Sequence, residues 1–208
     1  METFLGVSCV PDHKVYLSTL SGGLDSFLLT YMILKELPNS KVVLSTATHK
    51  HLNYYNLEYV NGIREKFEDL FPNRIIEHKI THYEDRADAR ARRGSVTRAL
   101  VEKYNIDGLF SGMTANPQDV KNLLTDDRDF TRDTPGEEKT KSMVINGKVV
   151  YHYQPFVNHT KKKVAELYQQ YDIMDLAALT ISCESETPPR PCEDCWWCRE
   201  KHWAFNFY

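Results

Sequence analysis

The sequence predicts an α/β fold, built on a doubly wound, mainly parallel sheet that carries a cysteine-rich C-terminal tail. Three observations lead to this prediction. Short apolar runs alternate with stretches of helical apolar spacing between residues 15 and 111. A turn rich in serine and glycine, residues 21–26, joins the first apolar run to the first helical stretch. Four of the five cysteines lie between residues 183 and 198.

Strands and helices are expected to alternate through the first half of the chain. The strands are expected at residues 15–19, 41–48, 74–80 and 106–111, and the helices at 27–37, 53–71 and 87–104. Ser26 is expected to be the N-cap of the first helix. Ligands bind at the carboxyl ends of the strands in such sheets, so residues 21–26, 48–53 and 112–118 should meet at one edge.

The second half of the chain begins with a polar and irregular segment, residues 114–142, which is either a surface loop or a lid over a substrate. Asn146-Gly147 between two apolar runs predicts a β-hairpin with a type I′ turn, and a helix is expected at about 160–171. We therefore expect a single domain. Its main part is residues 1–155, which include the variable loop and hairpin at about 114–153. Residues 156–208 are expected to pack against this part.

The overall composition gives no sign of a general affinity for nucleic acid or membranes. Hydrophobic residues make up 41% of the 208 residues, and the formal net charge is -3, so stable nucleic-acid binding is not expected. No stretch approaches the roughly 20 apolar residues that a membrane span requires. Residues 1–6 lack the basic and apolar pattern of a signal peptide, and a cytoplasmic location is the expectation.

The turn at residues 21–26, Ser-Gly-Gly-Leu-Asp-Ser, has the composition of a phosphate-binding turn. Gly22 and Gly23 allow a tight turn and bring backbone N–H groups close to an anion. The helix that follows directs unpaired N–H groups and the positive end of its dipole to the same place. The turn is not a Walker loop, because no lysine follows the glycines, and it lacks the third glycine of a Rossmann turn.

Cys183, Cys192, Cys195 and Cys198 form a metal-binding pattern, in which a C-x2-C-x2-C segment follows one further cysteine. Without a secretory signal, clustered cysteines favour a metal over disulfides. Four thiolates suit a structural Zn²⁺ with tetrahedral coordination. An iron–sulfur cluster and two disulfides remain as alternatives.

Taken together, these motifs resemble those of known enzymes. The S-G-G-x-D-S turn after a strand resembles the pyrophosphate loop of the N-type ATP pyrophosphatases, the PP-loop superfamily, whose fold is called adenine nucleotide alpha hydrolase-like. These enzymes cleave ATP between the α and β phosphates and transfer AMP to an oxygen. With Pro155 and Lys161, the segment Thr180-Ile181-Ser182-Cys183 and the cysteine spacing, the chain resembles the 7-cyano-7-deazaguanine synthase (QueC) family.

The resemblance implies an ATP-dependent ligase. Members of that family adenylate 7-carboxy-7-deazaguanine, aminate it with ammonia and dehydrate the amide to 7-cyano-7-deazaguanine, a precursor of queuosine and other deazapurine nucleosides. They contain a structural Zn²⁺ and are often homodimers, and their partners are small molecules. The resemblance assigns nucleotide binding to Leu20, Ser21, Gly22, Gly23, Leu24, Asp25, Ser26, Thr48 and Gly112, catalysis to Asp25, Ser26 and Lys161, and metal binding to Cys183, Cys192, Cys195 and Cys198.

Two of the implied catalytic residues have more than one interpretation. Asp25 is an acid beside polyphosphate, so we expect it to orient Mg²⁺ or to brace the turn. Lys161 either neutralises phosphate charge or belongs to a solvated face with Lys162 and Lys163.

The middle of the chain departs from the family pattern. Arg92-Arg93-Gly94-Ser95 stands where the family has an Arg-Asn pair, and the G-x-N-x-x-D and Gly-Tyr-Pro-Asp segments are missing after residue 112. Glu184 follows the first clustered cysteine, where an aromatic residue is common. Two alternatives follow from these departures. One is the same chemistry on another acceptor (a tRNA base, another carboxylate or a protein terminus), and the other is a nucleotide-binding zinc module without turnover.

Three further groups of residues have open roles. Arg92, Arg93 and Arg98 either bind a carboxylate or phosphate at the active-site edge or form an exposed or subunit-contacting helix face. The histidines show no tight ligand spacing and are expected to be structural or at the surface. The aromatic residues near the cysteines are expected to pack the tail onto the main domain: Trp196, Trp197, Trp203 and Phe205.

Overall fold

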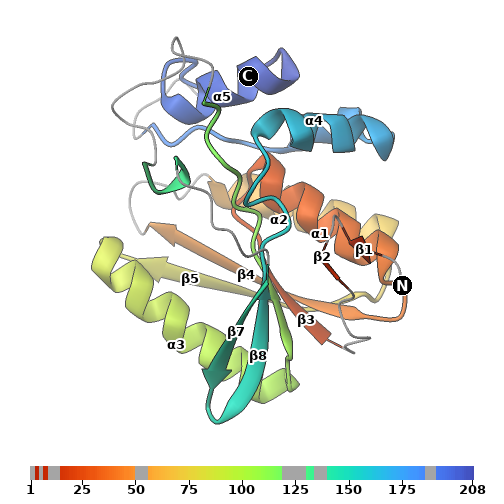
Figure 1. Cartoon of the computed structure of the whole chain (residues 1–208), viewed down its shortest axis with the longest axis vertical. Helices are drawn as coiled ribbons and strands as arrows, with labels where there is room; N and C mark the ends of the chain where they lie inside the picture. Colours follow the sequence, from red (N-terminus) through yellow and green to blue (C-terminus); the bar gives the residue numbers. More distant parts are fainter. Residues whose placement is uncertain are drawn as a thin grey trace.

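A six-stranded sheet in the order β5-β4-β3-β6-β8-β7 forms the centre of the protein (Figure 1). The computed structural model describes residues 3–4, 7–8, 15–49, 56–118, 130–133, 140–185 and 191–208. Neighbouring strands are parallel except β7, which is antiparallel to β8. The strands are β3 (Val15–Thr19), β4 (Lys41–His49), β5 (Ile75–Tyr83), β6 (Gly108–Phe110), β7 (Thr140–Ile145) and β8 (Lys148–Tyr153). Two short strands, β1 (Thr3–Phe4) and β2 (Val7–Ser8), form a separate antiparallel pair.

Helices cover both faces of the sheet, as the doubly wound fold requires. In Figure 1, α1 (Leu24–Glu36), α2 (Asn56–Leu70) and α4 (Lys161–Gln170) lie on one side of the strands, and α3 (Arg86–Tyr104) lies on the other. The strand side chains alternate accordingly. Tyr16 belongs to the core under α1, whereas the next residue, Leu17, belongs to the core under α3. The predicted α/β fold with a mainly parallel sheet is therefore confirmed.

The C-terminal part of the chain packs against α4. It contains the 3₁₀ helix η3 (Met174–Leu179) and the helix α5 (Trp196–Phe205), for which the sequence analysis gave no bounds. Trp196 is fully buried, and the ring of Phe205 meets that of Tyr168 at a centroid distance of 5.3 Å. Phe205 thus joins the tail to the main core, as expected, and Trp196 is enclosed in the interior.

The expected elements are present, with shifted ends. The first helix begins at Leu24, so the expected start at residue 27 is wrong. β5 continues to Tyr83, beyond residue 80, and the fourth strand is only Gly108–Phe110. Asn146 and Gly147 both have positive φ, 51° and 78°, which confirms the type I′ hairpin. Much of the expected irregular segment, including 119–129 and 134–139, lies outside the described residues.

The order of the strands identifies the edge at which a ligand should bind. The chain runs from β3 to β4 and β5 on one side, and then returns to place β6 on the other side of β3. The carboxyl ends of β3 and β6 therefore flank a topological switch point, where α/β sheets bind ligands. None of the described helices combines the length and the apolar character needed to cross a bilayer.

Candidate functional site

The turn between β3 and α1, residues 21–26, is held in shape by its own serines. The hydroxyl of Ser26 accepts a hydrogen bond from the backbone N–H of Ser21 at 3.1 Å and donates one to the carbonyl of Gly23 at 3.0 Å. The Ser21 hydroxyl lies 3.0 Å from that of Ser26. Gly22 has a φ of +89°, where a residue with a side chain would be strained. The turn is therefore formed in advance of any ligand.

The N-terminus of α1 opens directly onto this turn. The first intrahelical hydrogen bond runs from the N–H of Phe27 to the carbonyl of Gly23 at 3.1 Å. The N–H groups of Leu24, Asp25 and Ser26 precede that bond and are directed out of the helix end. Because Gly23 is the N-cap, the expectation that Ser26 caps the helix is wrong. Ser26 lies within the first turn, where its hydroxyl is already engaged by the loop.

A second glycine brings the chain that follows β6 against the start of α1. A Cβ atom on Gly112 would lie 2.9 Å from the carbonyl carbon and oxygen of Asp25 and 3.1 Å from the nitrogen of Ser26. Real Cβ atoms do not approach backbone this closely. Two residues further on, the Thr114 hydroxyl lies 3.5 Å from Asp25 Oδ2. The segment 111–114 thus forms a second wall of the site.

Asp25 and Lys161 form a buried ion pair between α1 and the first residue of α4. The side chain of Lys161 is 6% exposed and that of Asp25 is 19% exposed. The Lys161 ammonium also lies 3.7 Å from Glu200 Oε2, so it serves two carboxylates. This burial rules out the interpretation of Lys161 as part of a solvated lysine face.

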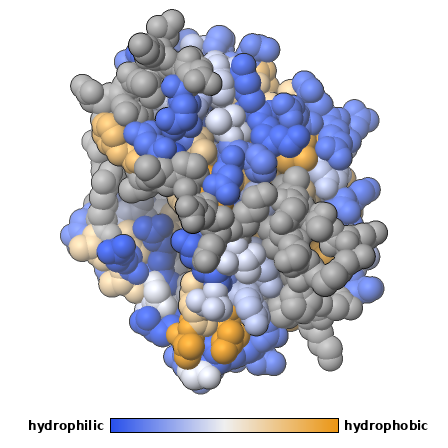
Figure 2. All heavy atoms as spheres, viewed as in Figure 1, coloured by the Kyte–Doolittle hydropathy of each residue, from blue (hydrophilic) through white to orange (hydrophobic). Residues whose placement is uncertain are grey.

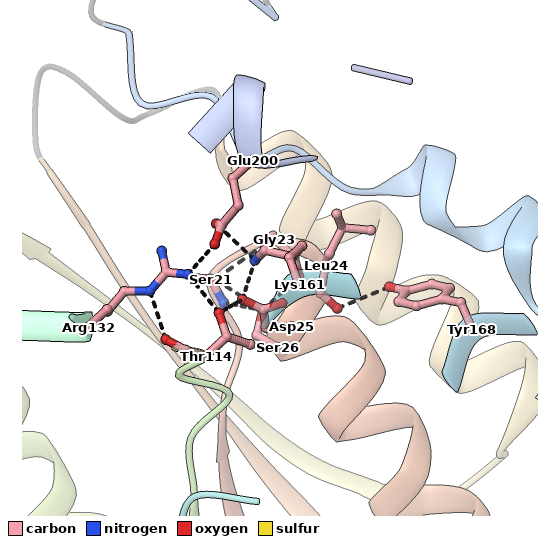
Figure 3. A network of polar contacts seen from close by, with 10 residues as sticks. All are labelled: Ser21, Gly23, Leu24, Asp25, Ser26, Thr114, Arg132, Lys161, Tyr168 and Glu200. Atoms are coloured by element: carbon pink, nitrogen blue, oxygen red, sulfur yellow. Dashed lines mark hydrogen bonds and ion pairs between the residues drawn. The ribbon is translucent and has the colours of Figure 1, made fainter. Parts of the chain in front are cut away.

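Arg132 extends the ion pair into a network that joins four separate parts of the chain (Figure 3). Its guanidinium donates to the carbonyl and to the hydroxyl of Thr114, both at 2.8 Å, and binds Glu200 Oε1. The side chain of Arg132 is 8% exposed and that of Glu200 is fully buried. The two cations compensate the two carboxylates of Asp25 and Glu200, so the network can be buried without a large net charge.

The network and the turn line a cavity of about 310 Å³. Several of the residues expected at the nucleotide and catalytic sites line it: Ser21, Gly23, Leu24, Asp25, Ser26, Gly112 and Lys161. Leu20, Gly22 and Thr48 are outside the described lining. Leu20 and Thr48 are buried, with exposed fractions of 0% and 2%, and Gly22 contributes its carbonyl to the hydrogen bond with Ile181.

Several residues at this site were not expected from the sequence. Thr114 and Arg132 belong to the polar segment that was interpreted only as a loop or lid, and Glu200 lies in the cysteine-rich tail. A charged residue in a polar stretch is ordinarily at the surface. No periodicity or motif in the sequence distinguishes Arg132 or Glu200 from such residues.

The four clustered cysteines come together at the start of α5. Their Sγ atoms all lie within 4.8 Å of one another, and those of Cys192 and Cys198 are 4.0 Å apart. Cys183 and Cys198 are almost fully buried, and all four thiols are unpaired, which gives the disulfide alternative no support. Burial raises the pKa of the Cys183 and Cys198 thiols, so a cation is needed to hold them as thiolates. The cluster could therefore hold a metal ion.

Two short segments connect this cysteine cluster to the turn at residues 21–26. The backbone N–H of Ile181, two residues before Cys183, donates to the carbonyl of Gly22 at 2.9 Å. Glu200, two residues after Cys198, belongs to the ionic network with Lys161. The cysteine cluster thus holds one backbone contact and one carboxylate of the site in place.

Three of the arginines of α3, Arg92, Arg93 and Arg98, divide into two groups. Arg92 pairs with Asp88 at 2.6 Å on the exposed side of the helix, whereas Arg93 and Arg98 line a second cavity on the sheet side. Two histidines have structural contacts, as expected. His78 Nε2 lies 2.9 Å from the Thr46 hydroxyl, and His152 Nε2 lies 2.8 Å from the Ser111 hydroxyl.

Comparison with known proteins finds similarity in structure but not in sequence. No protein-family model matches the chain, and no curated protein matches its sequence. NMN synthetase from Francisella tularensis is similar in structure, with a TM-score of 0.50 and 13% identity over 93% of this chain and 84% of that one.

Two further structures match less well. The U34-tRNA thiolase NcsA from Methanococcus maripaludis, described with its [4Fe-4S] cluster, has a TM-score of 0.49 and 16% identity over 92% of this chain. FMN adenylyltransferase from Candida glabrata, in complex with FMN and an ATP analogue, has a TM-score of 0.40 and 13% identity over 74% of this chain. The chain spans 65% of NcsA and 46% of FMN adenylyltransferase. At 13% identity, the likeness to NMN synthetase shows that the two chains share a fold and nothing about their activity.

Proposed function

We propose that this chain is an ATP-dependent adenylating enzyme that cleaves ATP between the α and β phosphates. The observation that carries the proposal is the preformed turn 21–26, with a glycine at positive φ, at the N-terminus of α1 and at the switch point of the sheet. Backbone N–H groups in this position stabilise the negative charge that builds up on departing pyrophosphate.

The ionic network supports a phosphate-handling role for Lys161. Its ammonium lines the cavity and is fixed by two carboxylates, Asp25 and Glu200, so its position is set before a ligand arrives. One oxygen of Asp25, Oδ1, is buried and has no hydrogen-bond partner among the described residues. A buried carboxylate oxygen of this kind suits Mg²⁺, which is bound by one or two carboxylates together with substrate phosphates.

The acceptor that we propose is 7-carboxy-7-deazaguanine, with ammonia as the second substrate and 7-cyano-7-deazaguanine as the product. Its support is the resemblance in the turn, the Pro155 to Lys161 spacing and the cysteine pattern. The carboxylate oxygen attacks the α-phosphorus, pyrophosphate leaves, and ammonia displaces AMP to give the amide. The amide oxygen is then activated in a second adenylation, and this oxygen leaves with AMP as the nitrile forms.

We propose that the cysteine cluster holds one structural Zn²⁺. Four sulfurs at tetrahedral corners, about 2.3 Å from a zinc ion, are separated by about 3.8 Å, close to the 4.0 Å between Cys192 and Cys198. A cube of four irons would hold its outer ligands further apart. The burial of Trp196 and the place of Phe205 in the main hydrophobic core support a single domain in which residues 156–208 pack on residues 1–155.

The test is a reaction mixture of the full chain with ATP, ammonium and 7-carboxy-7-deazaguanine, analysed by mass spectrometry. We expect AMP, pyrophosphate and the nitrile, and none of them in excess of background with Asp25→Asn. Formation of AMP without the nitrile would reject 7-carboxy-7-deazaguanine as the acceptor but would still support the proposed cleavage of ATP. If the chain bound ATP but released no pyrophosphate with any acceptor tested, the proposal that it is an enzyme would be rejected.

A second acceptor class is favoured by one observation. Thr114 and Arg132 come from the segment in which the chain departs from the family pattern, and both line the cavity. The wall of the site therefore differs from the family where a substrate would touch it. A screen of AMP release against other carboxylates and tRNA separates this alternative from the first.

A further inference from the structure

A second cavity, of about 450 Å³, lies on the opposite face of the sheet from α1. Its walls come from the middle of α3, from β3 and β6, and from the β7–β8 hairpin. In the space-filling view, apolar side chains gather at the lower end of the molecule, over this hairpin, where Val144 and Val149 are exposed (Figure 2). Small-molecule sites typically have volumes of about 300–1,000 Å³.

The two cavities meet at the topological switch point. Thr19, the last residue of β3, and Ser111, which follows β6, line both of them. The Thr19 hydroxyl donates to the carbonyl of Phe110 at 3.3 Å and ties the two strand ends together. The two cavities therefore adjoin at these two hydroxyl-bearing residues, and a molecule in the second would lie next to whatever occupies the first.

The side of α3 that faces the sheet changes from polar to apolar along the helix. Near its C-terminal end it buries Leu100 and Val101 in the core, as a helix on a sheet normally does. One to two turns earlier the same side presents Arg93, Thr97 and Arg98 to the cavity. Arg98 extends its guanidinium over Gly94, where an added Cβ would lie 3.5 Å from Nη1.

Neither cavity arginine has a carboxylate partner within the part of the chain that the structure describes. Arg93 donates from Nε to the carbonyl of Ala89 at 3.2 Å, and no ion pair with a described acid involves Arg93 or Arg98. Arg92, in contrast, is paired with Asp88 outside the cavity. Arg93 and Arg98 are exposed residues that line one cavity with no acid in its described lining, and two guanidinium groups placed in this way can bind an anion.

Much of the rest of the lining is apolar. Leu17, Leu109 and Met143 supply apolar surface. His152 is hydrogen-bonded to Ser111 at 2.8 Å, and burial lowers its pKa, so it is a neutral polar group at pH 7. The cavity therefore combines apolar walls, a few polar atoms and two cationic side chains, as small-molecule sites commonly do.

We propose that this second cavity binds the acceptor of the adenylation reaction, a planar heteroaromatic carboxylic acid, and that Arg93 and Arg98 bind its carboxylate. The proposal rests on the proposed function. An anionic nucleophile is repelled by polyphosphate, and two guanidinium groups offset this repulsion. A carboxylate oxygen then forms a bond to the α-phosphorus, the bond from that phosphorus to the bridging oxygen breaks, and pyrophosphate leaves with the electron pair.

Direct binding tests the proposal without turnover. Isothermal titration calorimetry would measure 7-carboxy-7-deazaguanine and indole-3-carboxylate against the full chain, with and without α,β-methylene-ATP. We expect Arg93→Gln and Arg98→Gln each to weaken binding of the acid roughly tenfold or more, the loss typical of a charge-assisted hydrogen bond. The affinity for the ATP analogue should change less than about twofold. The matched control, Arg92→Gln on the same helix, should leave both affinities unchanged.

The remaining outcomes are decisive. Unchanged acid binding in both cavity variants, or no binding of either acid to the wild-type chain, would overturn the proposal. A loss of affinity for the ATP analogue in Arg98→Gln would assign the cavity to the nucleotide instead. Arginine-dependent binding of the acid by a chain that releases no AMP would support this site and reject the proposed function. Thr97→Trp, which places a large side chain in the cavity, should abolish acid binding and spare the ATP analogue.

Discussion

Lys161 and Asp25 form a buried ion pair although 136 residues separate them in the chain. Lys161 begins α4 and Asp25 lies in the first turn of α1, so the pair joins the turn at residues 21–26 to the C-terminal part of the chain. Glu200 and Arg132 continue the contact to α5 and to η2 (Phe130–Arg132). Stability and ligand binding should therefore depend together on these charges.

Removing the lysine from this pair should destabilise the protein. Lys161→Met leaves two buried carboxylates with one cation fewer, and we expect the free energy of unfolding to fall by roughly 3 kcal/mol. Lys163→Met is the matched control, because Lys163 forms an exposed pair with Glu166 on the same helix and should change stability by less than about 0.5 kcal/mol. Urea denaturation measures both. Addition of Asp25→Asn to Lys161→Met should restore part of the loss, and strict additivity of the two changes would contradict a coupled pair.

A methyl group at Gly112 should damage the nucleotide site. Its Cβ would lie 2.9 Å from the Asp25 backbone, so Gly112→Ala must displace either the 111–114 segment or the start of α1. We expect ATP affinity to fall by roughly tenfold or more and stability to fall by about 1–3 kcal/mol. Gly62→Ala, inside α2 with nothing within 4 Å of the added Cβ, should instead stabilise by about 0.5–1 kcal/mol. Equal behaviour of the two alanine variants in nucleotide titrations would show that the close approach is unimportant.

The fold and half of the site could be predicted from local patterns. The alternation of apolar runs with helical spacing predicted the parallel sheet, and Asn146-Gly147 predicted the hairpin turn, because each depends on residues near one another in sequence. The glycines of residues 21–26 predicted a tight turn at a strand end for the same reason. Errors arose at element ends, where Gly23 displaced Ser26 as the N-cap because the hydroxyl of Ser26 is bound inside the turn.

The other half of the site depends on long-range contacts that leave no local pattern. Arg132 and Glu200 are 68 residues apart, and each is an ordinary charged residue in its own segment. Their burial becomes favourable only because the charge of each compensates the charge of the other, next to the Lys161–Asp25 pair. Lys161 was ambiguous for the same reason, since three consecutive lysines resemble a solvated face until the partner of the first is known.

Metal analysis should find one zinc ion for each chain and no stoichiometric iron. Cys198→Ser removes a ligand at the start of α5, so we expect loss of the metal and a Tm lower by roughly 5–10 °C. ATP affinity should fall as well, because Ile181 and Glu200 adjoin the cluster and contact the site. Cys9→Ser changes the remaining cysteine of the sequence and is the control for thiol loss. About four irons per chain, with visible absorption, would assign an iron–sulfur cluster in place of zinc.

Stability should fall on acidification through His78. The Thr46 hydroxyl donates to the carbonyl of Leu20 at 2.6 Å, so it accepts from His78 Nε2–H, and this contact supports the residue before the phosphate-binding turn. Burial, aided by the charge of Arg64, lowers the pKa of His78 to about 4 from the ordinary 6.5.

Above pH 6.5 the ring is neutral in both the folded and the unfolded chain and has no effect on the pH dependence. Between pH 6.5 and about 4 the unfolded chain takes up the proton first, so this contribution to stability is lost as the pH falls through that window. We expect a loss of roughly 1–2 kcal/mol from this group, allowing for its partial exposure.

Urea denaturation at pH 7.5 and pH 4.5 measures this loss. His78→Gln should show a smaller decrease in stability between the two pH values than the wild-type chain. His82→Gln, at an exposed position of the same strand, should match the wild-type decrease. If His78→Gln retained the full decrease, the acid sensitivity would not come from His78.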